Sequence, residues 1–156
     1  ATLGILLDYK LFSDHVLLKA SVIHDLIEDV PSTDIYGLRC IDNDAWKVVE
    51  LVQEVTRKPD EEKTHYLKRV LDNGSRNAQL LKAAARISNL TDLHIGFFSD
   101  QKMSKYLDET EQYILPMAIR VNQDMVIELR DLIEMRRKLI AKKPETSTFN
   151  LLKNEN

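Results

Sequence analysis

The chain has 156 residues, of which 44% are hydrophobic and 30% are charged. This is the length of one ordinary domain, and the apolar content is enough for a core, which excludes wholesale disorder. The formal net charge of −3 disfavours a general nucleic-acid binder, so no DNA partner is expected. Cys40 is the only cysteine, which excludes an internal disulfide and is typical of a cytoplasmic protein. No apolar run of about 18 residues occurs, so no membrane-spanning helix is predicted.

Apolar residues recur at three- and four-residue intervals through most of the chain, which predicts helices. The first clear helix covers 13–30 and stops at Pro31, and a short irregular or one-turn piece follows over 32–41. Asn43 or Asp44 is expected to cap a second helix. The inner face of that helix carries valines: Val48, Val49, Val52 and Val55.

The middle of the chain predicts two further helices and a turn. One helix begins near Asp60 and ends at Gly74, and Ser75 is expected to cap the next. That second helix carries apolar residues at helical spacing as far as Leu90. The segment 94–99 (HIGFFS) is predicted to be a turn.

The last third of the chain also predicts helices. Asp108 and Glu111 have the spacing of a capping box at a helix start, and Pro116 is expected to kink or break that helix. A long helix is predicted over 123–141, and the basic residues near its end complement its dipole.

No internal repeat or linker divides the chain. We therefore expect one all-α domain over 1–143 and a polar tail over 144–156.

The segment 23–30 (IHDLIEDV) combines one imidazole with three carboxylates. On a helix, His24 and Glu28 lie four residues apart, as do Asp25 and Asp29, so the imidazole and the three carboxylates can lie close together over one turn. Like charges at this spacing repel, and no Lys or Arg lies within the run to relieve them. A divalent ion such as manganese or iron, bound by imidazole nitrogen and carboxylate oxygen, would do so. The alternative interpretation is a solvated acidic face with an ordinary histidine.

Several segments together resemble the hydrolase domain of the RelA/SpoT homologue family, a branch of the HD-domain phosphohydrolases. The run 24–29 (HDLIED) resembles the family's hydrolase motif, and 48–56 (VVELVQEVT) resembles a family helix that ends in Val-Thr. The segment 81–93 (LKAAARISNLTDL) is similar to the family's Lys-Leu-Ala-Asp-Arg-Leu-x-Asn-Met segment. The segment 111–132 is similar to the helices that close the domain. The resemblance covers roughly residues 15–135, with the motifs in the family's order.

The resemblance implies an HD-domain helical bundle that removes pyrophosphate from the 3′ position of guanosine 3′,5′-polyphosphates, the alarmones ppGpp and pppGpp. It implies one Mn²⁺ ion held by two histidines and two aspartates, with His24 and Asp25 as the central ligands. The resemblance also implies that Glu28 and Asp29 orient or deprotonate the attacking water. A metal-bound water and a nearby carboxylate are a general device for such hydrolysis.

The resemblance also implies substrate-binding roles for Asn89, near the ribose and metal, and for Arg86.

Two departures from the family pattern stand out. Ala85 occupies the expected fourth-ligand position, and His15 is too close to His24 to be the first ligand, so we expect that an N-terminal part is absent. Ala85 is a substituted residue, a truncated side chain or a natural loss. We expect weak metal binding and little activity from the chain as written.

Two other functions remain open on the sequence alone. One is an HD phosphohydrolase that acts on another nucleotide, and the other is a degenerate, non-catalytic HD domain that binds a nucleotide or a partner. Lys63, His65, Lys68 and Arg69 could reach a phosphate, but a solvated helix face is the favoured interpretation. The chain has no phosphate loop of the GxxxxGK[ST] type and nothing that resembles an alarmone synthetase domain.

Overall fold

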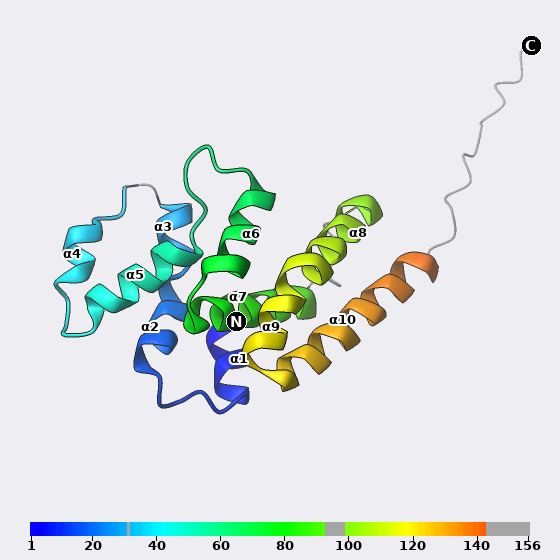
Figure 1. Ribbon diagram of the computed structural model, residues 1–156, viewed down its shortest axis with the longest axis horizontal. Coiled ribbons are helices and arrows are strands. Elements are labelled where there is room, and N and C mark those ends of the chain that lie inside the picture. Colours follow the sequence, from blue (N-terminus) through cyan, green and yellow to red (C-terminus); the bar gives the residue numbers. More distant parts are fainter. Residues whose placement is uncertain (31, 93–98, 143–156) are drawn as a thin grey trace, which may run out of the picture.

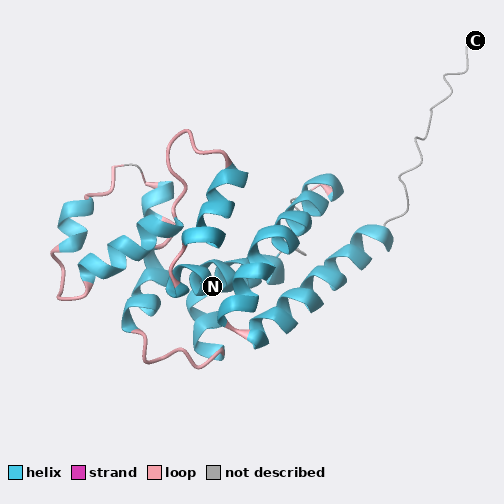
Figure 2. Cartoon of the chain, in the orientation of Figure 1, coloured by secondary structure: helices cyan, strands magenta, loops and turns pink. Residues whose placement is uncertain are grey.

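The computed structural model describes residues 1–30, 32–92 and 99–142, without the side chain of Glu28. All regular elements of these residues are helices, and no strand occurs among them (Figure 2). The predicted all-α class is therefore confirmed. No helix within these ranges is long and apolar enough to cross a membrane. The predicted polar tail and all but the last residue of the predicted turn over 94–99 lie outside the described residues.

The first half of the chain folds into short helices. They are α1 (Thr2–Asp8), α2 (His15–Ile23), α3 (Leu26–Asp29), α4 (Ile35–Arg39) and α5 (Ala45–Val55). The one-turn helix α4 and the longer α5 confirm two predictions, and all four predicted valines of α5 are buried.

The second half of the chain has longer helices and one π-helical turn. They are α6 (Lys63–Asn73), α7 (Arg76–Asp92), α8 (Asp100–Glu109), η1 (Thr110–Ile114), α9 (Leu115–Val121) and α10 (Gln123–Lys142). The hydroxyl of Ser75 accepts a hydrogen bond from the Ala78 amide at 3.2 Å, which confirms it as the cap of α7.

The break between α5 and α6 is a type II turn. Pro59 and Asp60 are its central residues, and the Glu61 amide donates to the Lys58 carbonyl at 3.2 Å. Asp60 has φ 62°, which this turn requires at its third position and which an aspartate tolerates better than most residues. Helix α6 therefore starts at Lys63, later than the pattern predicts.

The predicted capping box at Asp108 and Glu111 is wrong. Asp108 lies inside the last turn of α8, and the chain continues through η1 without a new helix start. Both carboxylates instead accept hydrogen bonds from Nη2 of Arg137, at 2.8 and 2.5 Å. A cation on a distant helix thus takes the place of the local capping interaction.

The predicted kink or break at Pro116 takes the form of a change from π-helix to α-helix just before the proline. The π-helical turn η1 ends just before α9, which has Pro116 near its first position. Proline has no amide hydrogen and crowds the preceding turn, so a wider turn is a physically reasonable way to accommodate it.

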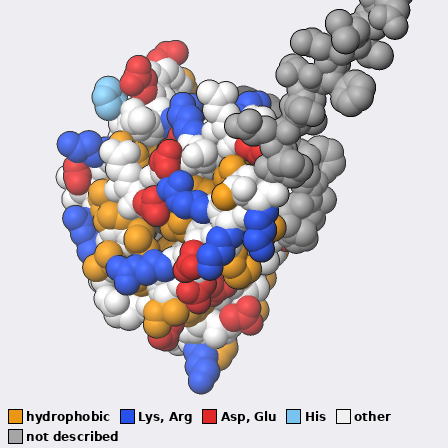
Figure 3. All heavy atoms as spheres, turned by 90° about the vertical axis from the view of Figure 1, so that its right-hand side faces the viewer, with side chains coloured by type: hydrophobic (Ala, Val, Ile, Leu, Met, Phe, Trp, Pro, Cys, Tyr) orange, Lys and Arg blue, Asp and Glu red, His pale blue; other side chains and the backbone are white. Residues whose placement is uncertain are grey.

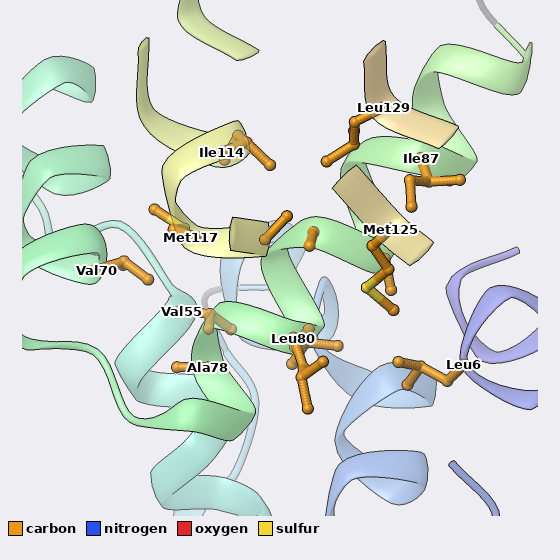
Figure 4. Close-up of a cluster of buried hydrophobic side chains, with 14 of the residues drawn as sticks. Leu6, Val55, Val70, Ala78, Leu80, Ile87, Ile114, Met117, Met125 and Leu129 are labelled. Carbon is orange, nitrogen blue, oxygen red and sulfur yellow. The ribbon is translucent and has the colours of Figure 1, made fainter. Parts of the chain in front are cut away.

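Helix α7 lies at the centre of the molecule. It contacts α1, α2, α5, α6, η1, α9 and α10 (Figure 1). Leu80 and Ile87 of α7 are fully buried in a cluster that also includes Leu6, Met125 and Leu129 (Figure 4). The segment similar to the family's Asp-Arg-Leu-x-Asn motif therefore lies on the most enclosed helix of the fold.

Candidate functional site

The predicted helix over 13–30 is interrupted at the two residues that matter most. Helix α2 ends at Ile23 and α3 begins at Leu26, so His24 and Asp25 form the junction. Both keep right-handed helical backbone angles, and the Asp29 amide still donates to the Asp25 carbonyl at 2.8 Å. The predicted one-turn spacing of Asp25 and Asp29 is thus retained, although the single long helix is wrong.

The imidazole of His24 is held by its own helix. Its Nδ1 lies 2.9 Å from the carbonyl oxygen of Ser21, which can only accept, so Nδ1 is the protonated donor. Its Nε2 lies 3.1 Å from Oδ1 of Asp25. In the neutral imidazole this nitrogen carries a lone pair, so two acceptor atoms face each other. A second ring proton or a metal cation is needed to make that contact favourable.

The two side chains differ in exposure. The His24 side chain is 15% exposed and the Asp25 side chain 71% exposed, so the ring is fixed while the carboxylate is open to solvent. Asp29 is also exposed. The side chain of Glu28 lies outside the described part of the structure.

A hollow of ≈ 670 Å³ lies between α3 and the loop that follows α5. Ile27 of α3 forms one wall, and the loop 56–62 forms the rest. Arg57 and Lys58 contribute cations to this wall, and Asp60, Glu61 and Glu62 contribute carboxylates. Neither His24 nor Asp25 is among the residues that line this hollow.

The metal-ligand set that the family resemblance implies is incomplete among the described residues. Ala85 is buried at 8% exposure on α7 and has no atom that could bind a metal. Within the described residues, no group of three or more His, Cys, Asp or Glu side chains is arranged to hold a metal ion. His24 and Asp25 fit two positions of a metal site, and the structure adds no third.

Arg86 and Asn89 of α7 converge on Tyr106 of α8. Nη1 of Arg86 donates to the Tyr106 carbonyl at 3.1 Å and to the Thr110 hydroxyl at 2.8 Å, and its Cζ lies 3.8 Å from the centre of the Tyr106 ring. Nδ2 of Asn89 donates to the Tyr106 hydroxyl at 3.2 Å. Burial lowers the pKa of Arg86. The two predicted substrate residues thus share one aromatic neighbour.

Lys63 and Glu109 complete this polar cluster. Nζ of Lys63 lies 2.6 Å from Oε2 of Glu109 and 5.5 Å from the centre of the Tyr106 ring. The sequence did not predict that Tyr106, Glu109 and Thr110 contact Arg86, Asn89 and Lys63. Their spacing of three and four residues places them on one helix face, which is the signal that could have grouped them.

The solvated-face interpretation is wrong for Arg69. Its Nε lies 2.7 Å from Oε1 of Glu61, and its Nη1 and Nη2 donate to the carbonyls of Glu54 and Thr56 at 2.9 and 3.0 Å. Arg69 therefore ties α6 to the end of α5 and to the turn that follows it. His65 and Lys68 are exposed, as that interpretation predicts.

A second hollow, of ≈ 460 Å³, lies between α10 and η1–α9. Leu115, Ile133 and Ala141 form its apolar floor, and its rim combines basic and acidic residues such as Arg130 and Glu134. Figure 3 shows this end of the molecule, where acidic, basic and apolar side chains are interspersed. Three cations and two carboxylates line this hollow, and two of the cations, Arg137 and Lys138, are already paired with carboxylates.

No protein-family model and no curated protein matches the chain.

Proposed function

We propose that the chain is an HD-type, metal-dependent hydrolase domain that removes the 3′-pyrophosphate of ppGpp and pppGpp to give GDP or GTP, and that Ala85 impairs it in this form. One observation supports the proposal most directly. His24 is locked with Nδ1 on a carbonyl and Nε2 facing the Asp25 carboxylate at 3.1 Å. This is the orientation that a metal-binding histidine needs, because the carbonyl fixes the tautomer that leaves Nε2 free.

The chemistry divides among the residues of the junction and of α7. A Mn²⁺ ion held by His24 and Asp25 would activate a water and offset charge on phosphoryl oxygens. Asp29 is exposed one turn from Asp25, so its carboxylate can accept a proton from an attacking water. Arg86 and Asn89 would orient the nucleotide. The single cysteine agrees with a cytoplasmic location for such an enzyme.

Ala85 also supports a second candidate, a degenerate HD domain that binds a nucleotide or a partner without hydrolysis. An alanine at the implied ligand position removes one metal bond, and Ala85 lies buried on α7 at 8% exposure. The two candidates differ in whether a carboxylate restored at position 85 creates activity.

The test is a gain of function. Ala85→Asp should raise Mn²⁺ affinity, measured by isothermal titration calorimetry, by at least about tenfold, since even an outer-shell partner of a metal has an effect of that size. The same variant should release pyrophosphate from ppGpp when Mn²⁺ is present. Ala85→Asn is the matched control, because it has the same shape without the anionic oxygen, and it should gain neither property.

Asp25→Ala in the Ala85→Asp background should abolish both gains. Asp25 is largely exposed, so circular dichroism should show an unchanged fold. If Ala85→Asp binds Mn²⁺ no better than Ala85→Asn, the proposed metal site is refuted. Hydrolysis of a nucleotide without a 3′-diphosphate, with ppGpp untouched, would favour the other HD phosphohydrolase activity. Nucleotide binding without any hydrolysis would favour the degenerate domain.

A further inference from the structure

Arg86 of α7 is a largely buried cation. The residue is 6% exposed, and it forms no ion pair with any residue that the structure describes. Both of its hydrogen bonds leave from Nη1 and end on neutral oxygens, the Tyr106 carbonyl and the Thr110 hydroxyl. Within the described ranges, Nε and Nη2 donate to no protein acceptor. An uncompensated buried charge is costly, so an anion bound here would be stabilised.

The surroundings of Arg86 do not supply that anion. The Glu109 carboxylate favours the charged form of Arg86, but it already contacts Nζ of Lys63 at 2.6 Å. Counting Lys63, Arg86 and Glu109 together leaves one positive charge in excess. The Tyr106 ring lies against both cations, 3.8 Å from Arg86 and 5.5 Å from Lys63.

The groups around the ring come from three helices. Lys63 belongs to α6, Arg86 and Asn89 to α7, and Tyr106 to α8. Lys63 and Asn89 are exposed, while Tyr106 is partly buried, so a ligand from solvent can reach the edge of the cluster. The Asn89 amide has a second N–H besides the one donated to the Tyr106 hydroxyl.

We propose that Lys63, Arg86 and Asn89, arranged round the Tyr106 ring, form an anion subsite that binds a phosphate group. The Nε and Nη2 atoms of Arg86, which donate to no acceptor among the described residues, match the geometry of phosphate oxygens, and Lys63 adds a mobile point charge. Lys63 exchanges its contact with Glu109 for the anion, so Glu109 limits the affinity. That the phosphate belongs to a nucleotide rests on the proposed function, whereas the subsite itself does not.

The experiment titrates inorganic pyrophosphate into the full chain by isothermal titration calorimetry, with EDTA present to remove metal. The wild-type chain should show saturable binding. Lys63→Met should weaken it about tenfold, as expected for the loss of one charge-assisted hydrogen bond. Glu109→Gln should strengthen it, because the variant frees Lys63 and removes a repelling carboxylate.

Lys68→Met is the matched control on the same helix. Lys68 is exposed and lies 3.9 Å from Asp72, so its loss removes the same formal charge away from Tyr106. Pyrophosphate affinity should be unchanged in this variant. Equal weakening by Lys63→Met and Lys68→Met, weaker binding by Glu109→Gln, or no saturable binding by the wild-type chain would each overturn the subsite.

The two proposals fail in different ways. The pyrophosphate titration uses neither metal nor hydrolysis, so its failure removes the subsite and leaves the His24–Asp25 metal pair untouched. Failure of Ala85→Asp to gain Mn²⁺ binding, with pyrophosphate binding intact, refutes the proposed function and leaves the subsite.

Discussion

At the scale of single residues, the ion pair of Glu61 and Arg69 illustrates how a charged side chain can become structural. The hydrogen bond from Arg69, with a second from the Lys58 amide, lowers the pKa of Glu61 from 4.5 to about 2. A folded-state pKa below the ordinary value means that ionised Glu61 stabilises the fold above pH 4.5. This contribution is lost as the pH falls from 4.5 through about 2.

Glu61→Gln should therefore lower the midpoint of thermal unfolding at pH 7. The difference between wild type and variant should shrink as the pH falls below 4.5 and be mostly lost at about pH 2, where Glu61 of the folded wild type becomes protonated. Glu62→Gln is the control, because Glu62 is an exposed neighbour on the same loop, and its effect should be small throughout. A wild-type-minus-variant difference that stays constant between pH 7 and pH 2 would contradict the pKa assignment.

At the scale of secondary-structure elements, α10 closes the end of α7 with a buried arginine. Arg136 is 7% exposed, and its Nε and Nη2 donate to the carbonyls of Leu90 and Thr91, both at 2.9 Å. The last carbonyls of a helix have no partner within the helix, and this side chain donates to two of them.

Arg136→Met should reduce the free energy of unfolding by about 1.5–3 kcal/mol, the range for hydrogen bonds to charged groups, as measured by urea denaturation. Arg137→Met is the matched control on the same helix. Arg137 is part-exposed and pairs with surface carboxylates, so its loss should cost only about 0–1 kcal/mol. Equal costs for the two variants would show that the contact with α7 carries no special stability.

At the scale of the whole molecule, stability depends on the packing of the other helices around α7. Leu80→Ala should destabilise the chain by about 2–5 kcal/mol, because it leaves a cavity among fully buried side chains. Val22→Ala, at a position that is 65% exposed, should change the free energy of unfolding by less than about 0.5 kcal/mol. Chemical denaturation followed by circular dichroism measures both. A small loss for Leu80→Ala would mean that α7 is not the centre of the core.

Much of the fold is predictable from local pattern. The three-four rhythm of apolar residues correctly predicts α5, α6, α7 and α10, and the inner valines of α5. The pattern is wrong where local signals compete with distant partners. Asp108 and Glu111 have the spacing of a cap, but Arg137 from another helix binds both carboxylates.

The candidate site, like the fold, was predictable from the sequence only in part. His24 and Asp25 are neighbours in the chain, so their proximity needs no tertiary information. The interruption of the helix at these two residues and the contact between Nε2 and Oδ1 did not follow from spacing. Arg86 and Asn89 were named from the family resemblance, but their common neighbour Tyr106 was not, because it is 17 residues from Asn89 in sequence.

The amino-acid order alone was sufficient for the helical class, most helix positions and the acidic turn, since these depend on contacts within about four residues. The packing of α6, α7 and α8 was needed to show which charges are paired and which is left over. Arg86, Arg69 and Arg136 look alike as letters in the sequence. In the structure, Arg86 forms no ion pair with a described residue, Arg69 pairs with Glu61, and Arg136 caps the end of α7. They differ because the partner of a long side chain depends on which helices lie within its reach.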